Sequence, residues 1–520
     1  MRAGRCRTRA GRLLAIAAST ALCALYASAG APWHWVGWFA FVPWLLAQDA
    51  TERPRAAMLE AWLFTAAFTG AALWWFPDVM HRYTGAPAAL CWLIYLGLSP
   101  LLEPQLLAWA AARRLGGRAA GVLACVGVEW AFPKLLADTF GYGMFPSGDI
   151  RQVADLGGMP GLTLLVLGVN EALAFALRAA LERRPRPAAL AVALGGAAML
   201  AAGGYGHWRR AQLASQRGST FVAGLVQSNL THYADMAERE GTYAVTMRIL
   251  QTHGAISRKL AASEPLDLLV WPETAYPTTF GAPQSDEGVE TDAEISHLVA
   301  ALQVPLLFGT YDTDGTHEYN AALLLGPDGA RLGTYRKARL FPLTEETPAW
   351  LEGARSWWPW LGTWKAGSGA AVLRIPLRGG GTASVAPLIC YDSLDPSLAA
   401  TARRLGAQAL VSLSNDGWFG GTPAVELHLV SAAFRSIETR LPQARATPSG
   451  ISASISAAGD ILLRAEPERP SGVLAELSIA NSTLTPAARW GQWPGPTSLL
   501  AAAALLARKA LRAPRLRRPG

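Results

Sequence analysis

The chain has 520 residues, of which 51% are hydrophobic and 16% are charged, and its formal net charge is +8. This balance excludes an ordinary soluble protein, which carries more charge, and a pure bundle of membrane helices, which carries less. We therefore expect membrane helices over residues 1–207, a soluble domain over 218–485, and a last membrane helix with a basic tail over 494–520.

Apolar segments close to 20 residues in length are candidates for crossing a bilayer. Seven precede the soluble domain and a weaker eighth follows it, at 13–29, 33–47, 56–75, 86–110, 119–132, 162–181, 188–205 and 496–511. Polar residues interrupt them at Glu60, Glu103, Glu129, Asn170 and Glu171. Because such groups are costly at membrane depth, we expect each of them to pair with a neighbouring helix.

Basic residues set the expected orientation. Arginines gather before the first candidate span, after the second, fourth and sixth, and after the last, whereas the intervening loops carry only Arg82, Lys134 and Arg151. The positive-inside bias then places both termini in the cytoplasm and the soluble domain outside. These anchors also account for the net charge, so we expect no nucleic-acid partner. An alternative interpretation makes residues 1–29 a cleaved signal peptide, but the closeness of 33–47 favours an uncleaved helical hairpin.

The soluble domain alternates short apolar strands with amphipathic helices. Strands are predicted at 221–227, 266–271, 305–310, 321–325, 331–335, 371–375, 383–389 and 409–413, and helices at 243–260, 293–302, 396–405 and 423–439. Strands that alternate with helices or pair in hairpins are typical of an α/β sandwich. Pro387 cannot donate a ladder hydrogen bond, which indicates a sheet edge or a bulge at that position.

Cys390 stands at the polar end of the strand 383–389, where a strand can present a nucleophile. It is the only one of five cysteines in the soluble domain, so it has no disulfide partner there. A lone cysteine is more often a small buried residue, and a catalytic role needs partners. A histidine base is not indicated, because only His428 follows Cys390 and it lies in the predicted helix 423–439 without a supporting motif.

Metal and cofactor chemistry are not indicated either. The eight histidines show no metal-ligand spacing, and the sequence contains no phosphate loop and no dinucleotide fingerprint. We therefore expect no metal and no cofactor.

Two other residues could complete a site around the thiol. Glu273 directly follows the buried strand 266–271, a position that suits a general base. Lys337 is one of only five lysines in a chain that otherwise uses arginine, which indicates that a compact ammonium is required there. Taken singly, each residue is more often a solvated surface charge than a catalytic group.

The order Glu273, Lys337, Cys390 resembles the nitrilase superfamily, whose catalytic residues are Glu, Lys and Cys. Four segments narrow the resemblance to the apolipoprotein N-acyltransferase family: WPE at 271–273, YRKARLFP at 335–342, ICY at 389–391 and SNDGWFG at 414–420. It covers nearly the whole chain. It implies about eight transmembrane helices and a nitrilase-like α-β-β-α sandwich on the periplasmic side of the bacterial inner membrane.

The resemblance also implies roles for individual residues. Glu273 would be the general base, Lys337 the oxyanion stabiliser and Cys390 the nucleophile. Supporting residues would be Tyr391 and a second glutamate, Glu345 by spacing or its neighbour Glu346. Tyr233 and Trp418 would contact the substrate. The family usually has glutamate after its Cys-Tyr pair, whereas Asp392 is one methylene shorter, so whatever this carboxylate holds must lie closer.

The predicted function is transfer of a fatty acyl chain from a membrane phospholipid, through a Cys390 thioester, to the N-terminal amine of the diacylglyceryl-cysteine of apolipoproteins. Phospholipid and lipoprotein would be the partners of a membrane-embedded monomer. Two alternatives are open. The chain could be a membrane-tethered amidase or an acyltransferase with another amine acceptor, or it could be an inactive paralogue that binds lipoproteins.

Overall fold

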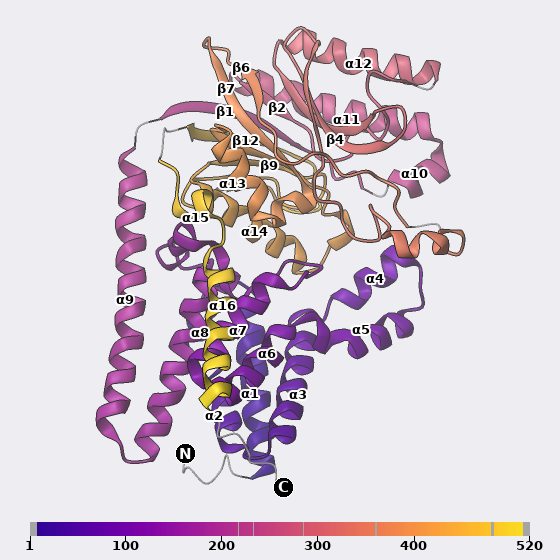
Figure 1. The fold of residues 1–520 in the computed structure, drawn as a ribbon. Coiled ribbons are helices and arrows are strands. Elements are labelled where there is room, and N and C mark those ends of the chain that lie inside the picture. The colour runs from indigo at the N-terminus through magenta and orange to yellow at the C-terminus, as the bar shows by residue number, and fades with distance from the viewer. Residues whose placement is uncertain are drawn as a thin grey trace. The chain divides into compact units, whose positions relative to one another are not determined.

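The chain forms two compact units in the computed structural model, Met1–Ala211 with Trp490–Gly520, and Gln212–Arg489 (Figure 1). The structure describes residues 8–216, 218–231, 233–283, 285–358, 361–479 and 483–512. The basic residues before position 8 and after position 512 lie outside the described residues.

The first unit is helical. Its elements are α1 (Arg9–Ala27), η2 (Trp33–Trp38), α2 (Val42–Ala50), α3 (Pro54–Ala72), α4 (Phe76–Thr84), α5 (Ala88–Leu102), α6 (Pro104–Gly116), α7 (Arg118–Ala131), η3 (Phe140–Met144), η4 (Ile150–Val153), α8 (Ala154–Leu181), α9 (Pro185–Ser215) and α16 (Pro494–Arg512).

The prediction of about eight membrane-spanning helices is not confirmed. Among the described residues, four helices are long and apolar enough to cross a membrane, at Arg9–Ala27, Ala88–Gly116, Ile150–Leu181 and Pro185–Ser215. A fifth span would be the pair α3 and α4, which is bent by 65°. The predicted span 33–47 is divided between η2 and the nine-residue α2, and 119–132 lies in the 14-residue α7.

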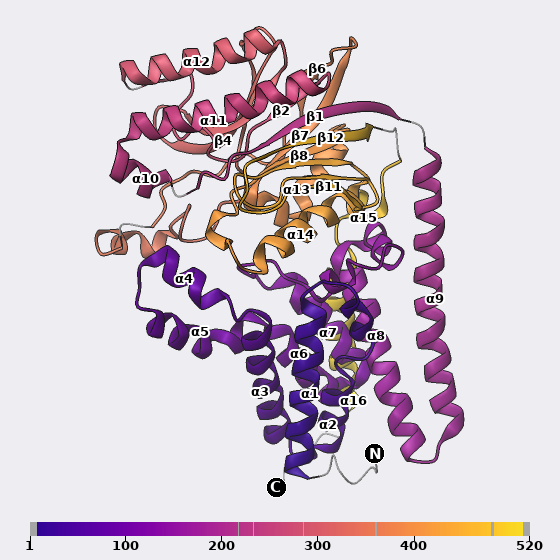
Figure 2. The same ribbon diagram turned by 180° about the vertical axis from the view of Figure 1, so that it is seen from behind.

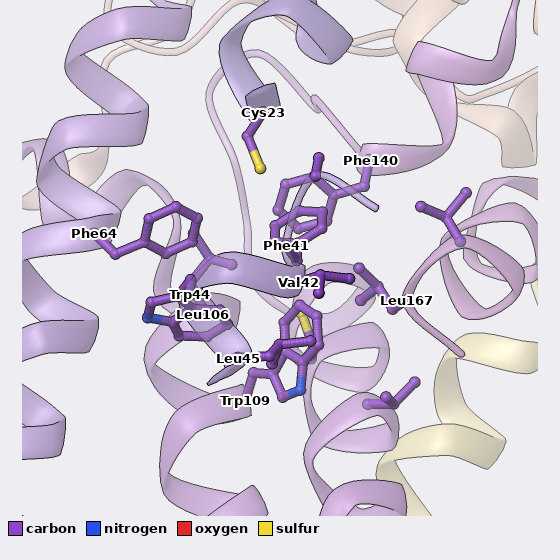
Figure 3. Packing of buried hydrophobic residues seen from close by; sticks show 14 of the residues in the cluster. Cys23, Phe41, Val42, Trp44, Leu45, Phe64, Leu106, Trp109, Phe140 and Leu167 are labelled. Atoms are coloured by element: carbon purple, nitrogen blue, oxygen red, sulfur yellow. The ribbon is translucent and has the colours of Figure 1, made fainter. Parts of the chain in front are cut away.

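An aromatic cluster fills the centre of this unit. Phe41 and Trp44, at the start of α2, pack on Phe64 of α3 and Trp109 of α6 (Figure 3). All four are fully buried, and Phe140 of η3 closes the cluster against Phe41 at 5.1 Å between ring centroids. The part of the segment 33–50 around Phe41 and Trp44 is therefore packed in the core of the unit, whereas Trp33, Trp35 and Phe39 are exposed.

The polar residues within the helices are paired, as predicted. Glu60 accepts from Arg12 at 2.6 Å, and Glu103 from Lys134 at 2.8 Å. Glu129 accepts from the hydroxyls of Thr139 and Thr163 and from the backbone N–H of Phe140, Asn170 bonds the backbone of Phe41 and Gly37, and Glu171 binds Arg113 and Arg118.

The second unit contains two six-stranded sheets. The first has the order β12-β1-β2-β3-β4-β5, and the second β11-β10-β9-β8-β7-β6. The strands are β1 (Ser219–Gln227), β2 (Leu268–Val270), β3 (Leu306–Thr313), β4 (Glu318–Leu325), β5 (Arg331–Arg336), β6 (Leu373–Pro376), β7 (Thr382–Ile389), β8 (Ala409–Leu413), β9 (Gln443–Ala446), β10 (Ala453–Ile455), β11 (Ile461–Arg464) and β12 (Ser471–Ile479).

Helices cover the outer faces of both sheets. The remaining elements of this unit are α10 (Tyr233–Glu240), α11 (Thr242–Ser263), α12 (Asp286–Leu302), η5 (Ala349–Ser356), η6 (Cys390–Leu394), α13 (Pro396–Arg404), η7 (Gly417–Phe419), α14 (Ala424–Thr439) and α15 (Pro486–Trp490). Both views show α11 and α12 on one side of the sheets and α13 and α14 on the other (Figure 1, Figure 2). One continuous apolar cluster joins the facing sheets, for example Leu225 and Val270 with Val385 and Val411. The unit is thus the α-β-β-α sandwich that the resemblance implied.

Every strand and helix predicted in the soluble domain is present within about three residues of its predicted ends, except that the helix predicted at 293–302 begins seven residues earlier, at Asp286. Sequence analysis missed α10 and the four strands β9 to β12. Pro387 pairs with Val411 of β8, and it lies past Val385, the last residue of β7 in register with β6. The strand is therefore an edge on that side at Pro387, as predicted, and no donor is required there.

Candidate active site

Cys390 sits at the point where β7 ends and the 3-10 turn η6 begins. Its φ is +46°, in the left-handed region that side chains other than glycine rarely adopt. Such a conformation costs on the order of 1–3 kcal/mol and persists only where the surroundings hold it. The structure therefore turns the chain sharply at the predicted nucleophile.

The pKa of the Cys390 thiol is raised well above its ordinary range. Removal from water is the largest cause, the negative charge of Glu273 adds to it, and the positive charge of Lys337 opposes it. The resting group is thus a neutral thiol, which requires a base before it can attack a carbonyl.

Glu273 follows β2 by three residues and is 5% exposed. Its Oε1 accepts from Lys337 Nζ at 2.9 Å and from Asn320 Nδ2 at 2.8 Å. Gly309 of β3 allows this approach, because a Cβ there would lie 2.5 Å from the carbonyl oxygen of Pro272 and 2.6 Å from the Cα of Glu273. The backbone that carries Glu273 is packed directly on β3.

We expect Gly309→Ala to move Glu273 and to destabilise the unit. Overpacking a buried position typically costs about 1–3 kcal/mol, and misplacing a reacting group by about 1 Å can cost up to 10²-fold in rate. Thermal unfolding and the rate at which Cys390 reacts measure the two effects. Gly379→Ala is the control, since a Cβ at Gly379 meets no atom within 4 Å. Equal behaviour of the two variants would contradict the prediction.

Lys337 follows β5 and is 2% exposed. Its ammonium lies between two carboxylates, 2.9 Å from Glu273 Oε1 and 2.8 Å from Glu345 Oε1. Burial alone would lower the pKa of Lys337, but these two carboxylates and the Cys390 sulfur hold it well above its usual range. Lys337 is therefore a permanent cation beside the thiol.

The second glutamate of this group is Glu345, whereas its neighbour Glu346 is exposed. Glu345 Oε2 accepts from the backbone N–H of Phe341, and its Oε1 accepts from Asn320 Nδ2 at 3.0 Å as well as from Lys337. Asn320 of β4 thus bridges both glutamates. Sequence reasoning missed it, because a lone asparagine in a strand carries no motif.

Asp392 has a role that the sequence did not reveal. Its two oxygens accept from the N–H groups of Ile389 at 2.9 Å, Ala338 at 3.2 Å and Arg339 at 2.7 Å, and from the hydroxyl of Tyr335 at 2.8 Å. The side chain is fully buried. Its hydrogen bonds connect the turn that carries the thiol to the loop that carries Lys337. The aspartate side chain, although one methylene shorter than glutamate, still reaches these donors.

Asp392 makes the stability of this unit depend on pH. Burial raises the pKa of Asp392 from 3.8 to about 6, against the opposing effect of its hydrogen bonds. Because the folded carboxyl binds its proton more tightly than the unfolded one, its contribution to stability is present below pH 3.8 and is lost as pH rises through 6, by about 3 kcal/mol.

We therefore expect the difference in unfolding free energy between wild type and Asp392→Asn to change between pH 4 and 6.5 and to be flat above pH 7. Thermal unfolding in detergent across this range measures the difference. The contributions of the other titrating groups to the free energy of unfolding cancel, because both proteins contain them. A difference that is constant with pH would contradict the prediction.

The remaining predicted residues surround this group. Tyr391 follows the thiol in η6, and its ring contacts that of Phe341 at 5.1 Å between centroids. Tyr233 begins α10 and interacts electrostatically with Tyr311, as do Glu273 and Glu345. Burial is the main cause that raises the pKa of Tyr311, and these three groups raise it further. Trp418, in η7, is 39% exposed.

The segments that carry Tyr233 and Trp418 lie close together, because a Cβ on Gly417 would be 2.9 Å from the side chain of Thr231. Of the predicted site residues, Glu273, Lys337 and Glu345 are joined by direct hydrogen bonds, and all three interact electrostatically with Cys390. Tyr233 and Trp418 lie in flanking segments.

His428 also contacts the turn that carries Cys390, at a backbone carbonyl rather than at the thiol, so the contact does not make it the base of a Cys-His pair. It lies in α14 as predicted, and its Nε2 is 3.3 Å from the carbonyl oxygen of Cys390. Helix α14 packs on η6, the turn that begins at Cys390, and so brings His428 to this carbonyl. The local sequence around His428 does not show this contact. No cluster of three or more His, Cys, Asp or Glu side chains suited to a metal occurs in the described part of the chain.

Two family models match the chain in separate regions. The model described as carbon-nitrogen hydrolase matches residues 210–488. The model described as apolipoprotein N-acyltransferase N-terminal domain matches residues 20–172. The two matches together therefore take in most of the helical unit and the whole sandwich.

Curated relatives match over most of their length. They include the apolipoprotein N-acyltransferases of Caulobacter vibrioides, 31% identical over 80% of this chain and 79% of the relative, and of Geobacter metallireducens, 29% identical over 82% of each. The enzyme of Bdellovibrio bacteriovorus is 28% identical over 93% of this chain and 91% of the relative. With a carbon-nitrogen hydrolase sandwich and a matching N-terminal region, the chain belongs to the apolipoprotein N-acyltransferase family.

Proposed function

We propose that lipoprotein N-acylation, the activity of this family, proceeds in this chain through a thioester on Cys390. The acyl donor is a membrane phospholipid, and the acceptor is the N-terminal amine of a diacylglyceryl-cysteine. The observation that carries the proposal is the buried, hydrogen-bonded group of Glu273, Lys337 and Glu345, which interacts electrostatically with Cys390 at the end of β7.

In the first half-reaction Glu273 takes the proton of the Cys390 thiol, and the sulfur attacks the ester carbonyl carbon of the phospholipid. The negative charge that develops on the carbonyl oxygen is stabilised by the Lys337 ammonium and by the backbone N–H of Tyr391. Collapse breaks the ester C–O bond, the proton returns from Glu273 to the leaving oxygen, and lysophospholipid departs.

In the second half-reaction the acceptor amine attacks the thioester carbonyl. Glu273 takes a proton from the amine, the same donors stabilise the second oxyanion, and the C–S bond breaks. An amide forms on the lipoprotein, and Cys390 leaves as a thiolate that regains its proton from Glu273. Glu345 and Asn320 hold the lysine and the base in place through both steps.

The orientation in the membrane is also a proposal. Arg113 at the end of α6 and Arg118 at the start of α7 both bind Asp49 of α2 and Glu171 of α8, and Arg178 of α8 lies 3.5 Å from Asp49. The basic ends of α6, α7 and α8 therefore meet around Asp49 of α2. This supports a cytoplasmic location for that end in the bacterial inner membrane, with the sandwich in the periplasm.

Product analysis separates the proposal from its alternatives. Purified protein is given phospholipid and a synthetic diacylglyceryl-cysteine peptide, and the products are followed by mass. Wild type should convert the peptide to its N-acylated form with equimolar lysophospholipid. Release of free fatty acid with an unchanged peptide would favour an amidase-like or hydrolytic enzyme, and no product with tight peptide binding would favour an inactive paralogue.

A further inference from the structure

His428, which contacts the turn η6 at Cys390, also contacts two charged residues, Asp416 and Arg445. Its Nδ1 lies 2.8 Å from Asp416 Oδ1, and Arg445 Nη2 lies 2.8 Å from Asp416 Oδ2. Asp416 and Arg445 are almost completely buried, with 1% and 0% exposed. The packing is tight, because a Cβ on Gly450 would lie 2.2 Å from Asp416 Oδ2.

Both ring nitrogens of His428 face oxygen atoms that accept. A carbonyl oxygen lies at Nε2, and a carboxylate lies at Nδ1. Burial would raise the pKa of Asp416, but Arg445 and His428 hold it well below its usual range, so the carboxylate has no proton to donate. Because a carbonyl oxygen can only accept, Nε2 donates to Cys390, while Nδ1 faces both Asp416 Oδ1 and Arg445 Nη2, the latter at 3.3 Å.

The contact at Nε2 fixes the direction of a peptide group. In a trans peptide the C=O and the N–H point to opposite sides of the chain. The carbonyl of Cys390 belongs to the same peptide unit as the N–H of Tyr391. If the carbonyl oxygen is held toward α14, the N–H of Tyr391 is held away from α14.

We propose that His428 is a positioning residue for acyl transfer, which holds the Cys390 carbonyl and thereby directs the Tyr391 N–H to the oxyanion of the tetrahedral intermediate. Asp416 and Arg445 fix the ring. This inference rests on the proposed function, since it assigns a donor to the proposed intermediate. It also accounts for the left-handed backbone at Cys390, which needs partners that hold it in place.

Three substitutions separate the two contacts of the ring. His428→Ala removes both. His428→Asn keeps a polar group near Asp416 but does not reach the Cys390 carbonyl, whereas the amide nitrogen of His428→Gln can lie near the position of Nε2 and donate to that carbonyl. The control is His253→Gln, a second buried histidine of the same unit, whose Nδ1 contacts the carbonyl of Ile249 in its own helix.

Two reactions of Cys390 are measured in detergent, acylation with phospholipid present and alkylation with phospholipid omitted. Acylation by phospholipid, followed by intact mass in a single turnover, passes through an oxyanion. Alkylation by iodoacetamide displaces iodide and forms no oxyanion. Loss of an oxyanion donor typically lowers rates by about 10²–10³-fold. We expect acylation to fall about 10²-fold in His428→Ala and His428→Asn and to recover to within about tenfold of wild type in His428→Gln, with alkylation within about twofold of wild type in all three.

Three results would overturn the inference: acylation at the wild-type rate in His428→Ala, an equal loss of alkylation and acylation, or no recovery in His428→Gln. A wild-type protein that is alkylated but never acylated would instead overturn the thioester proposal itself. The two failures are therefore distinguishable in one experiment.

Discussion

The substitution Glu273→Gln is expected to lower the rate of Cys390 acylation by about 10²–10⁴-fold, the range that a general base contributes. Glutamine keeps the shape of the side chain, and its Oε1 can still accept from Lys337 and Asn320. The ability to take the thiol proton is lost, together with one negative charge beside Lys337. Because the pKa of Cys390 is raised, no preformed thiolate can replace the base at neutral pH. Single-turnover acylation followed by intact mass measures the effect.

Glu345→Gln is the matched comparison for this base. It also removes one negative charge from Lys337, but Glu345 is not the proposed proton acceptor. We expect its acylation rate to exceed that of Glu273→Gln by at least about tenfold. If the two variants were equally slow, the role of Glu273 would be to hold the charge of Lys337 rather than to act as a base.

The second large effect is expected for Lys337→Met, which removes the cation between Glu273 and Glu345. Breaking a buried ion pair typically costs about 3–5 kcal/mol of stability, and losing an oxyanion donor costs about 10²–10³-fold in rate. We therefore expect a lower unfolding temperature together with loss of acylation. Thermal unfolding in detergent and the acylation assay measure the two effects.

Lys365→Met controls for the loss of a lysine as such, because Lys365 belongs to the same unit but is exposed. Its stability and acylation should remain close to those of wild type. Wild-type acylation in folded Lys337→Met would contradict the assignment of Lys337 as the oxyanion donor.

The sequence was most informative where a local pattern determines the local structure. The strands and helices between residues 218 and 439 were predicted to within about three residues, apart from the start of α12, because hydrophobic periodicity and turn residues act over short distances. The strands after residue 439 were missed. β9 is only four residues long and fully buried, and β10 has three residues, so neither shows an alternation of apolar and polar residues that would indicate a strand.

The helical unit shows how composition misleads. Residues 33–50 are as apolar as a membrane span, but His34, Trp38 and Trp44 are buried within the unit as part of η2 and α2. An apolar composition indicates that a segment is removed from water, but it does not show whether lipid or protein surrounds the segment. The prediction of about eight spans is therefore not confirmed, while the pairing of the interrupting polar residues was predicted correctly.

The candidate site divides in the same way. Glu273, Lys337 and Cys390 stand at strand ends and carry motifs, so they were identified before the fold. Asn320, Asp392 and His428 act through contacts between residues distant in the sequence, 47 residues apart for Asn320 and Glu273 and 38 for His428 and Cys390. Such contacts depend on how two sheets and a helix pack, which no local pattern records.

The thioester on Cys390 is tested most directly by intact mass after incubation of purified protein with phospholipid and no acceptor. We expect wild type to gain the mass of one acyl chain, to lose it on treatment with hydroxylamine, and to transfer it when diacylglyceryl-cysteine peptide is added. Cys390→Ala should gain no mass under the same conditions. An adduct of equal size on Cys390→Ala, or no adduct on folded wild type in the presence of phospholipid, would contradict acyl transfer through this cysteine.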